Sequence, residues 1–119
     1  MAYHGSMLET AMVNENYRQV ITTGKYIQLV AMSLKPGEDT GEQTHDGGVA
    51  FFFVAGEGNG HIDNDTFEVA AGDDAVITTG SRYRFKAEGS EPLKFLVVYA
   101  PPKYEDSLVQ KSKSEEKKK

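Results

Sequence analysis

The stretch Gly37-Glu-Asp-Thr-Gly-Glu-Gln-Thr-His-Asp-Gly-Gly-Val-Ala-Phe-Phe-Phe-Val-Ala-Gly56 decides the fold. Its second half is aromatic and β-branched and stops at glycine, which is typical of a strand that ends in a tight turn. Successive side chains of a strand point to opposite faces, so three consecutive phenylalanines require cover on both faces. The stretch therefore predicts a central strand with one face inside a core.

Short β-prone runs with turn residues between them occupy most of the remaining chain. They recur every 8–12 residues or so, which is the pattern of an all-β sandwich or barrel. A turn of helix is expected only within residues 8–16, because no longer stretch has a helical period. The expected strands cover residues 26–34, 49–54, 61–62, 66–69, 75–79, 83–86 and 93–99.

Two spaced motifs make the chain resemble a small single-domain cupin. In the first, Gly37, Gln43, His45, Val49 and Gly56 stand where that family has G-x5-H-x-H-x3-E-x6-G. In the second, G-x5-P-x-G-x2-H-x3-N, the corresponding residues are Gly72, Thr78, Gly80, Tyr83 and Ala87. The resemblance implies an all-β cupin double-stranded β-helix, a jelly-roll barrel.

The resemblance extends to a group of short bacterial cupins labelled as mannose-6-phosphate-isomerase-like. The matching segments include Asn14–Arg18, Gln28–Glu38 and Tyr99–Pro102. We expect an N-terminal arm over residues 1–15, the barrel over 16–102, and a polar, disordered, flexible C-terminal tail over 103–119. The last nine residues contain no apolar side chain to bury.

The four motif positions supply three imidazoles and a carboxylate to a metal ion in metal-binding cupins. In this chain the positions hold Gln43, His45, Val49 and Tyr83, of which only His45 is a good ligand. An amide is a weak ligand for a transition metal, valine has no ligand atom, and a phenol ionises only near pH 10. We therefore expect degenerate metal motifs and no metal cofactor, with His45 and Gln43 as the ligands if any metal binds.

The period of two predicts which side chains line the barrel. If Val49 and Tyr83 point inward, then Phe51 and Phe85 do so too, whereas Arg82 and Arg84 point outward. Such an interior either forms a ligand pocket with a few polar groups or is simply filled by its aromatic rings. The expected ligand-binding residues are Met32, Gln43, His45, Val49, Phe51, Tyr83 and Phe85.

Composition excludes several classes of protein. The 119 residues contain no cysteine and carry a net charge of −5, so disulfides, thiolate zinc sites and a basic face for nucleic acid are not expected. No apolar run approaches the roughly 20 residues of a membrane helix. The first residues lack the apolar core of a signal peptide. We therefore expect a cytoplasmic protein that binds neither nucleic acid nor membranes.

Three functions remain open. The first is metal-independent binding of a small organic molecule in the barrel. The second is a sugar or keto-acid isomerase, epimerase or lyase with His45 and Tyr83 as its catalytic acid–base pair. The third is a sequestering or interaction protein. A homodimer is expected in each case, because the outer face of the phenylalanine strand needs cover and small cupins commonly pair through their N-terminal strands.

Overall fold

The computed structural model describes residues 2–115 and consists mostly of antiparallel strands. After helix α1 (Met7–Val13) come β1 (Arg18–Thr23), β2 (Gln28–Leu34), β3 (Gly48–Ala55), β4 (Glu57–Ile62), β5 (Asp65–Ala70), β6 (Asp74–Ile77), β7 (Tyr83–Glu88), β8 (Leu93–Ala100) and β9 (Val109–Gln110). A short 3₁₀ turn, η1 (Lys113–Glu115), follows. The expected all-β architecture is confirmed, and a helix of about two turns, α1, lies where a turn of helix is expected within residues 8–16.

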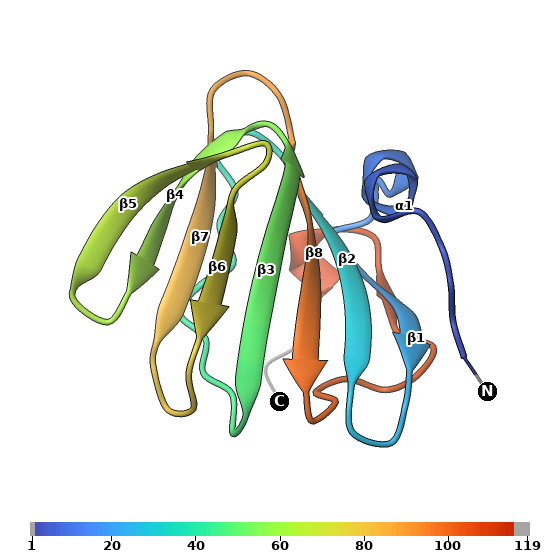
Figure 1. Ribbon diagram of the computed structural model, residues 1–119. Helices are drawn as coiled ribbons and strands as arrows, with labels where there is room; N and C mark the ends of the chain where they lie inside the picture. Colours follow the sequence, from blue (N-terminus) through green and yellow to red (C-terminus); the bar gives the residue numbers. More distant parts are fainter. Residues whose placement is uncertain (1, 116–119) are drawn as a thin grey trace.

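Two sheets face each other and enclose the core (Figure 1). The larger sheet has the strand order β6-β3-β8-β2-β1-β9, and the smaller has the order β5-β4-β7. Both contribute to one buried cluster, which includes Phe51 and Phe53 from β3, Phe85 from β7 and Phe95 from β8. The core therefore lies between the sheets, as in a barrel.

The alternation of side chains along β3 and β7 agrees with the period of two. Val49, Phe51 and Phe53 are buried, whereas Phe52, between them, is half-buried on the outer face. Tyr83 and Phe85 are likewise buried, and Arg82 and Arg84 are exposed.

Helix α1 covers part of the outer face of the large sheet. Ser6 caps the helix by accepting a hydrogen bond from the Glu9 N–H at 3.2 Å, which satisfies one free donor of the first turn. Ala11 is fully buried against Ala31 and Leu96, which lie on that outer face. The N-terminal arm thus covers part of the outer face of the large sheet, which the three consecutive phenylalanines of β3 predict to be covered. Among residues 2–115, neither α1 nor η1 has the length of a membrane-spanning helix.

Motif glycines stand at turns that need a left-handed backbone. Gly56, which ends the deciding stretch, has φ +88°, and an added Cβ would collide with the backbone of Pro92 and Leu93. Gly72, at the start of the second motif, has φ +95°. These positions hold glycine for a conformational reason and carry no chemistry themselves.

The segment 101–115, here called the C-terminal strap, packs against the barrel. Tyr104 and Leu108 contact the main core, and β9 pairs with β1. This corrects the expectation of a disordered tail from residue 103, because apolar side chains in the first part of that tail find a surface to bury. The end of the expected tail, residues 116–119, lies outside the described residues.

Candidate functional site

The polar motif residues lie at the end of the barrel where β3 and β7 begin and β8 ends. Gln43 pairs with Tyr83 through two backbone hydrogen bonds of 2.8 and 2.9 Å, which fixes the segment before β3 against β7. Val49 is opposite Tyr99 in the β3–β8 register, and the His45 ring packs edge-on against Tyr99 at 5.3 Å between centroids. The structure therefore brings the motif positions of the two halves of the chain to one end of the barrel.

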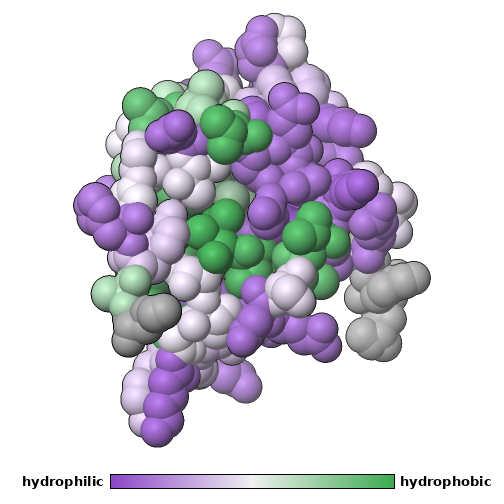
Figure 2. All heavy atoms as spheres, turned by 90° about the vertical axis from the view of Figure 1, so that its right-hand side faces the viewer, coloured by the Kyte–Doolittle hydropathy of each residue, from purple (hydrophilic) through white to green (hydrophobic). Residues whose placement is uncertain are grey.

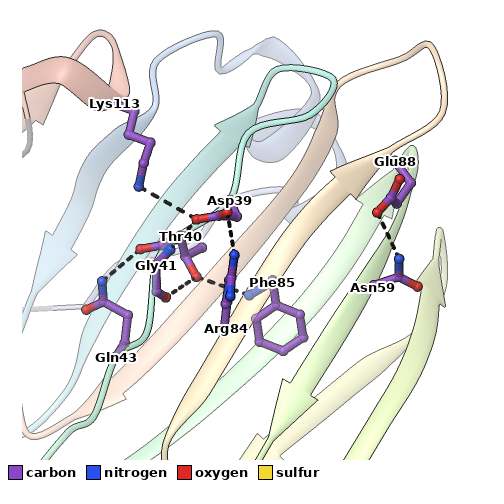
Figure 3. A network of polar contacts seen from close by, with 9 residues as sticks. All are labelled: Asp39, Thr40, Gly41, Gln43, Asn59, Arg84, Phe85, Glu88 and Lys113. Atoms are coloured by element: carbon purple, nitrogen blue, oxygen red, sulfur yellow. Dashed lines mark hydrogen bonds and ion pairs between the residues drawn. The ribbon is translucent and has the colours of Figure 1, made fainter.

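Both ends of the Gln43 amide are engaged. Its Nε2 donates to the Thr40 carbonyl at 2.9 Å, and its Oε1 accepts from Lys103 Nζ at 3.2 Å. Thr40 is itself held, because its hydroxyl accepts from the Phe85 N–H at 3.1 Å and donates to the Gly41 carbonyl at 2.8 Å (Figure 3). Gln43 is thus oriented with its oxygen toward the C-terminal strap.

His45 is tied to the start of the strap. Its Nε2 lies 2.7 Å from the Pro101 carbonyl oxygen. A carbonyl only accepts, so Nε2 carries the hydrogen of this bond and has no lone pair to offer. The half-buried ring joins the segment before β3 to the strap.

Tyr83 is the most unusual residue of the set. Only 2% of its surface is exposed, yet its hydroxyl has no hydrogen-bond partner within the part of the chain that the structure describes. Burial, and then the neighbouring Tyr104, raise its pKa far above the ordinary value, although the Tyr99 hydroxyl and Arg18 oppose the rise. The Tyr99 hydroxyl is close enough to act on that pKa, but the two oxygens do not meet hydrogen-bond geometry. Tyr83 is therefore a neutral phenol with a proton to donate.

The residues at the four motif positions do not fit a metal ion. Gln43 directs its oxygen to a lysine ammonium, His45 donates from Nε2, Val49 has no ligand atom, and Tyr83 is held neutral. No group of three or more His, Asp or Glu side chains placed to hold a metal occurs among residues 2–115.

The expected apolar lining residues are together, but they are packed. Met32, Val49, Phe51 and Phe85 all belong to the main core cluster. The Phe51 ring lies 4.5 Å from Phe85 and 5.5 Å from Tyr83, between centroids. Phe53 and Phe95 continue this packing, with their ring centroids 5.2 Å apart.

Other side chains at this end were not singled out from the sequence. Tyr99 lies next to the end of β8, and extending the inward period from Leu93 along that strand would have found it. Arg18 is 2% exposed, and its guanidinium lies over the rings of Tyr17 at 5.0 Å and Tyr104 at 4.5 Å. The strap supplies Lys103 and Tyr104. No signal in the sequence distinguished these two residues from the charged residues that follow them in the expected tail.

Gln28 clamps the strap over this end of the barrel. Its buried Oε1 accepts from the backbone N–H groups of Lys103 and Tyr104, each at 3.0 Å, and its Nε2 donates to the Tyr104 carbonyl at 2.7 Å. A second attachment runs through Asp39, which binds Arg84 at 2.9 Å and lies 4.0 Å from Lys113 (Figure 3). Partial burial raises the pKa of Asp39, but the hydrogen bonds from Arg84 and the Gly41 N–H lower it more, so this carboxylate is ionised at neutral pH.

Comparison with known proteins agrees with this architecture. Residues 30–99 match the model of the cupin domain family. The chain is 31% identical over 110 residues to the uncharacterized protein YrkC of Bacillus subtilis, and the match covers 86% of this chain and 59% of that protein. The chain thus spans well under two thirds of the length of this relative.

Solved structures show the same fold. The protein BH2720 from Bacillus halodurans is 24% identical, with a TM-score of 0.91 over 96% of this chain and 92% of that one. A protein with a double-stranded β-helix domain from Klebsiella pneumoniae is 23% identical, with a TM-score of 0.72 over 84% of this chain and 91% of that one. With the family match covering more than half of its residues, the chain belongs to the cupin family.

Proposed function

We propose that this cupin binds a small organic molecule at the tyrosine end of its barrel, without a metal ion. The observation that carries the proposal is the buried Tyr83 hydroxyl, which has no partner within residues 2–115. A buried hydroxyl without a hydrogen bond costs on the order of 1–3 kcal/mol, so a partner from outside the chain is favoured there. A carbonyl, hydroxyl or carboxylate oxygen of a ligand would accept its proton.

The surroundings of this hydroxyl suit a ligand with a polar group. Tyr99 and Tyr104 lie beside Tyr83, with the buried Arg18 close enough to act on the pKa values of Tyr83 and Tyr99. The phenols of Tyr83 and Tyr99, whose pKa values are raised, are neutral hydrogen-bond donors. Aromatic faces with a few convergent polar groups are typical of small-molecule sites. The same groups support a site without a metal, because Gln43 Oε1 accepts from Lys103, His45 donates from Nε2 and Tyr83 stays neutral.

Native mass spectrometry of protein purified without chelator tests the proposal. We expect the wild type to carry an organic adduct and Tyr83→Phe to have lost most of it. Tyr26→Phe is the matched control, because Tyr26 is 70% exposed and does not belong to the proposed site. This variant should keep the adduct. An adduct retained by Tyr83→Phe, or a wild-type chain of bare mass, would overturn the proposal.

The acid–base alternative has less support. A catalytic pair of His45 and Tyr83 needs an imidazole that can accept a proton, and His45 uses Nε2 to bind Pro101. Only Nδ1 would remain as a base. Tyr83, with its raised pKa, would serve as an acid and not as a base.

We further propose that two copies of the chain associate through the outer face of the large sheet and α1. Leu8 and Val13 of α1 are 59% and 70% exposed, and Ile27, directly before β2, is 55% exposed. A groove of about 820 Å³ on the same side is lined in part by Tyr3, Ile27, Leu29 and Val98. Figure 2 shows hydrophobic side chains gathered in the middle of the face that carries α1 and β1, with hydrophilic ones around them. Such a patch favours a self-complementary contact.

A further inference from the structure

The ammonium group of Lys103 lies in a cage of three tyrosines. Its Nζ is 5.9 Å from the ring centroid of Tyr83, 5.6 Å from that of Tyr99 and 5.7 Å from that of Tyr104. Each distance is within the range of about 6 Å over which an aromatic face attracts a cation. Three rings around one nitrogen form a site and not a chance surface contact.

Two oxygen atoms of the barrel also contact this ammonium group. Gln43 Oε1 accepts from Lys103 Nζ at 3.2 Å, and the Thr44 carbonyl accepts at 3.0 Å. The acceptors are fixed independently of the lysine, because the Gln43 amide is held by Thr40 and the Thr44 carbonyl is backbone. The cage therefore presents ring faces and acceptors to one point, which is the chemistry that recognises an ammonium ion.

Most of the cage belongs to the barrel and not to the strap. The strap contributes only two residues of the cage, Lys103 and Tyr104. The barrel contributes the other four, which are Gln43, Thr44, Tyr83 and Tyr99. The strap backbone at residues 103 and 104 is clamped separately by Gln28. The flexible Lys103 side chain can therefore leave while the rest of the cage stays in place.

We propose that this cage is a binding site for small primary amines, and that Lys103 is its built-in occupant and competitor. The inference names the ligand class of the site proposed above and rests on that proposal. An amine that displaces Lys103 exchanges one ammonium for another, so it adds no net charge beside Arg18. The Tyr83 hydroxyl, which has no partner among residues 2–115, is left to donate to an acceptor elsewhere on the same ligand.

Removal of the occupant is the direct test. In Lys103→Ala, n-propylammonium chloride should raise the thermal unfolding midpoint by a few degrees in a saturable manner, relative to sodium chloride at equal ionic strength. The wild type should respond far less, because Lys103 competes from within the chain. Lys103→Met, which fills the cage with an uncharged chain, should also give little response.

The chain offers a matched control in Lys25, whose Nζ lies 5.3 Å from the ring of one exposed tyrosine, Tyr26. Lys25→Ala should gain no response to the amine. Propanol and sodium propionate should not stabilise Lys103→Ala. Equal responses in Lys103→Ala and the wild type, no response in Lys103→Ala, or stabilisation by propionate in place of the amine would overturn the inference.

The test also separates this inference from the proposed function. A wild type of bare mass, together with a saturable amine response in Lys103→Ala, would reject a resident ligand and retain an amine-selective cage. A wild-type adduct that Tyr83→Phe loses, together with no amine response in Lys103→Ala, would retain the ligand site and reject its ligand class.

Discussion

Tyr83 shows at the residue scale how a change of side chain alters what a barrel can do. The position belongs to the second motif, where metal-binding members of the family have histidine. A phenol there is buried, held neutral and without a hydrogen-bond partner among the described residues. In the proposed function, this position offers a proton donor to a ligand in place of a lone pair to a metal.

Tyr83→Phe should not destabilise protein that has been refolded from denaturant to remove bound small molecules. Loss of an unpartnered hydroxyl leaves the free energy of unfolding at pH 7 unchanged or raises it by about 1 kcal/mol. Tyr99→Phe should lower it by about 1 kcal/mol, because the Tyr99 hydroxyl interacts with Tyr104. Chemical denaturation measures both values, and an equal loss in the two variants would mean that Tyr83 has a partner within the chain.

The stability of the protein at alkaline pH provides a second test of Tyr83. The pKa of Tyr83 is higher in the folded chain than in the unfolded chain, where it is about 10. Its contribution to stability is therefore complete below pH 10 or so and is lost as the pH rises further. Tyr83→Phe should lose less stability than the wild type between about pH 10 and 12, as followed by denaturant unfolding at each pH.

At the scale of elements, most strands were predictable, whereas β1, the first part of β4 and the strap were not. The run Val49–Val54 and the alternation after Tyr83 predict β3 and β7 with the correct inward faces, because period and burial are local properties of a strand. The strap consists of polar residues with a few apolar ones, such as Tyr104 and Leu108, and its order depends on contacts with distant strands. Hence the sequence predicted Gln43, His45 and Tyr83 for the site but missed Lys103 and Tyr104.

Gln28→Leu should release the strap. The change removes the hydrogen bonds to Lys103 and Tyr104 and leaves three partly buried backbone groups without these partners, which should lower the free energy of unfolding by about 2–4 kcal/mol. Amide hydrogen exchange should quicken over residues 103–110 and change little in β4, β5 and β7. Uniform quickening across both sheets would instead indicate that Gln28 supports the whole core.

At the scale of the whole molecule, the proposed dimer can be weighed directly. Light scattering at micromolar concentration should give a mass near twice 13.1 kDa. Leu8→Asp combined with Val13→Asp should lower the mass toward that of one chain, because charge on the exposed face of α1 opposes its burial. Thr66→Asp, at an exposed position of β5 in the smaller sheet, is the control. A wild-type mass of one chain would contradict the dimer.

The central claim concerns what occupies the tyrosine end of the barrel. Electron density from crystals of protein purified without chelator, with anomalous data, tests it most directly. The account predicts density for an organic molecule with an acceptor atom within hydrogen-bond distance of Tyr83 Oη, and no anomalous peak beside Gln43 and His45. A metal ion bound to His45, or a Tyr83 hydroxyl bonded to a group of the protein itself, would contradict it.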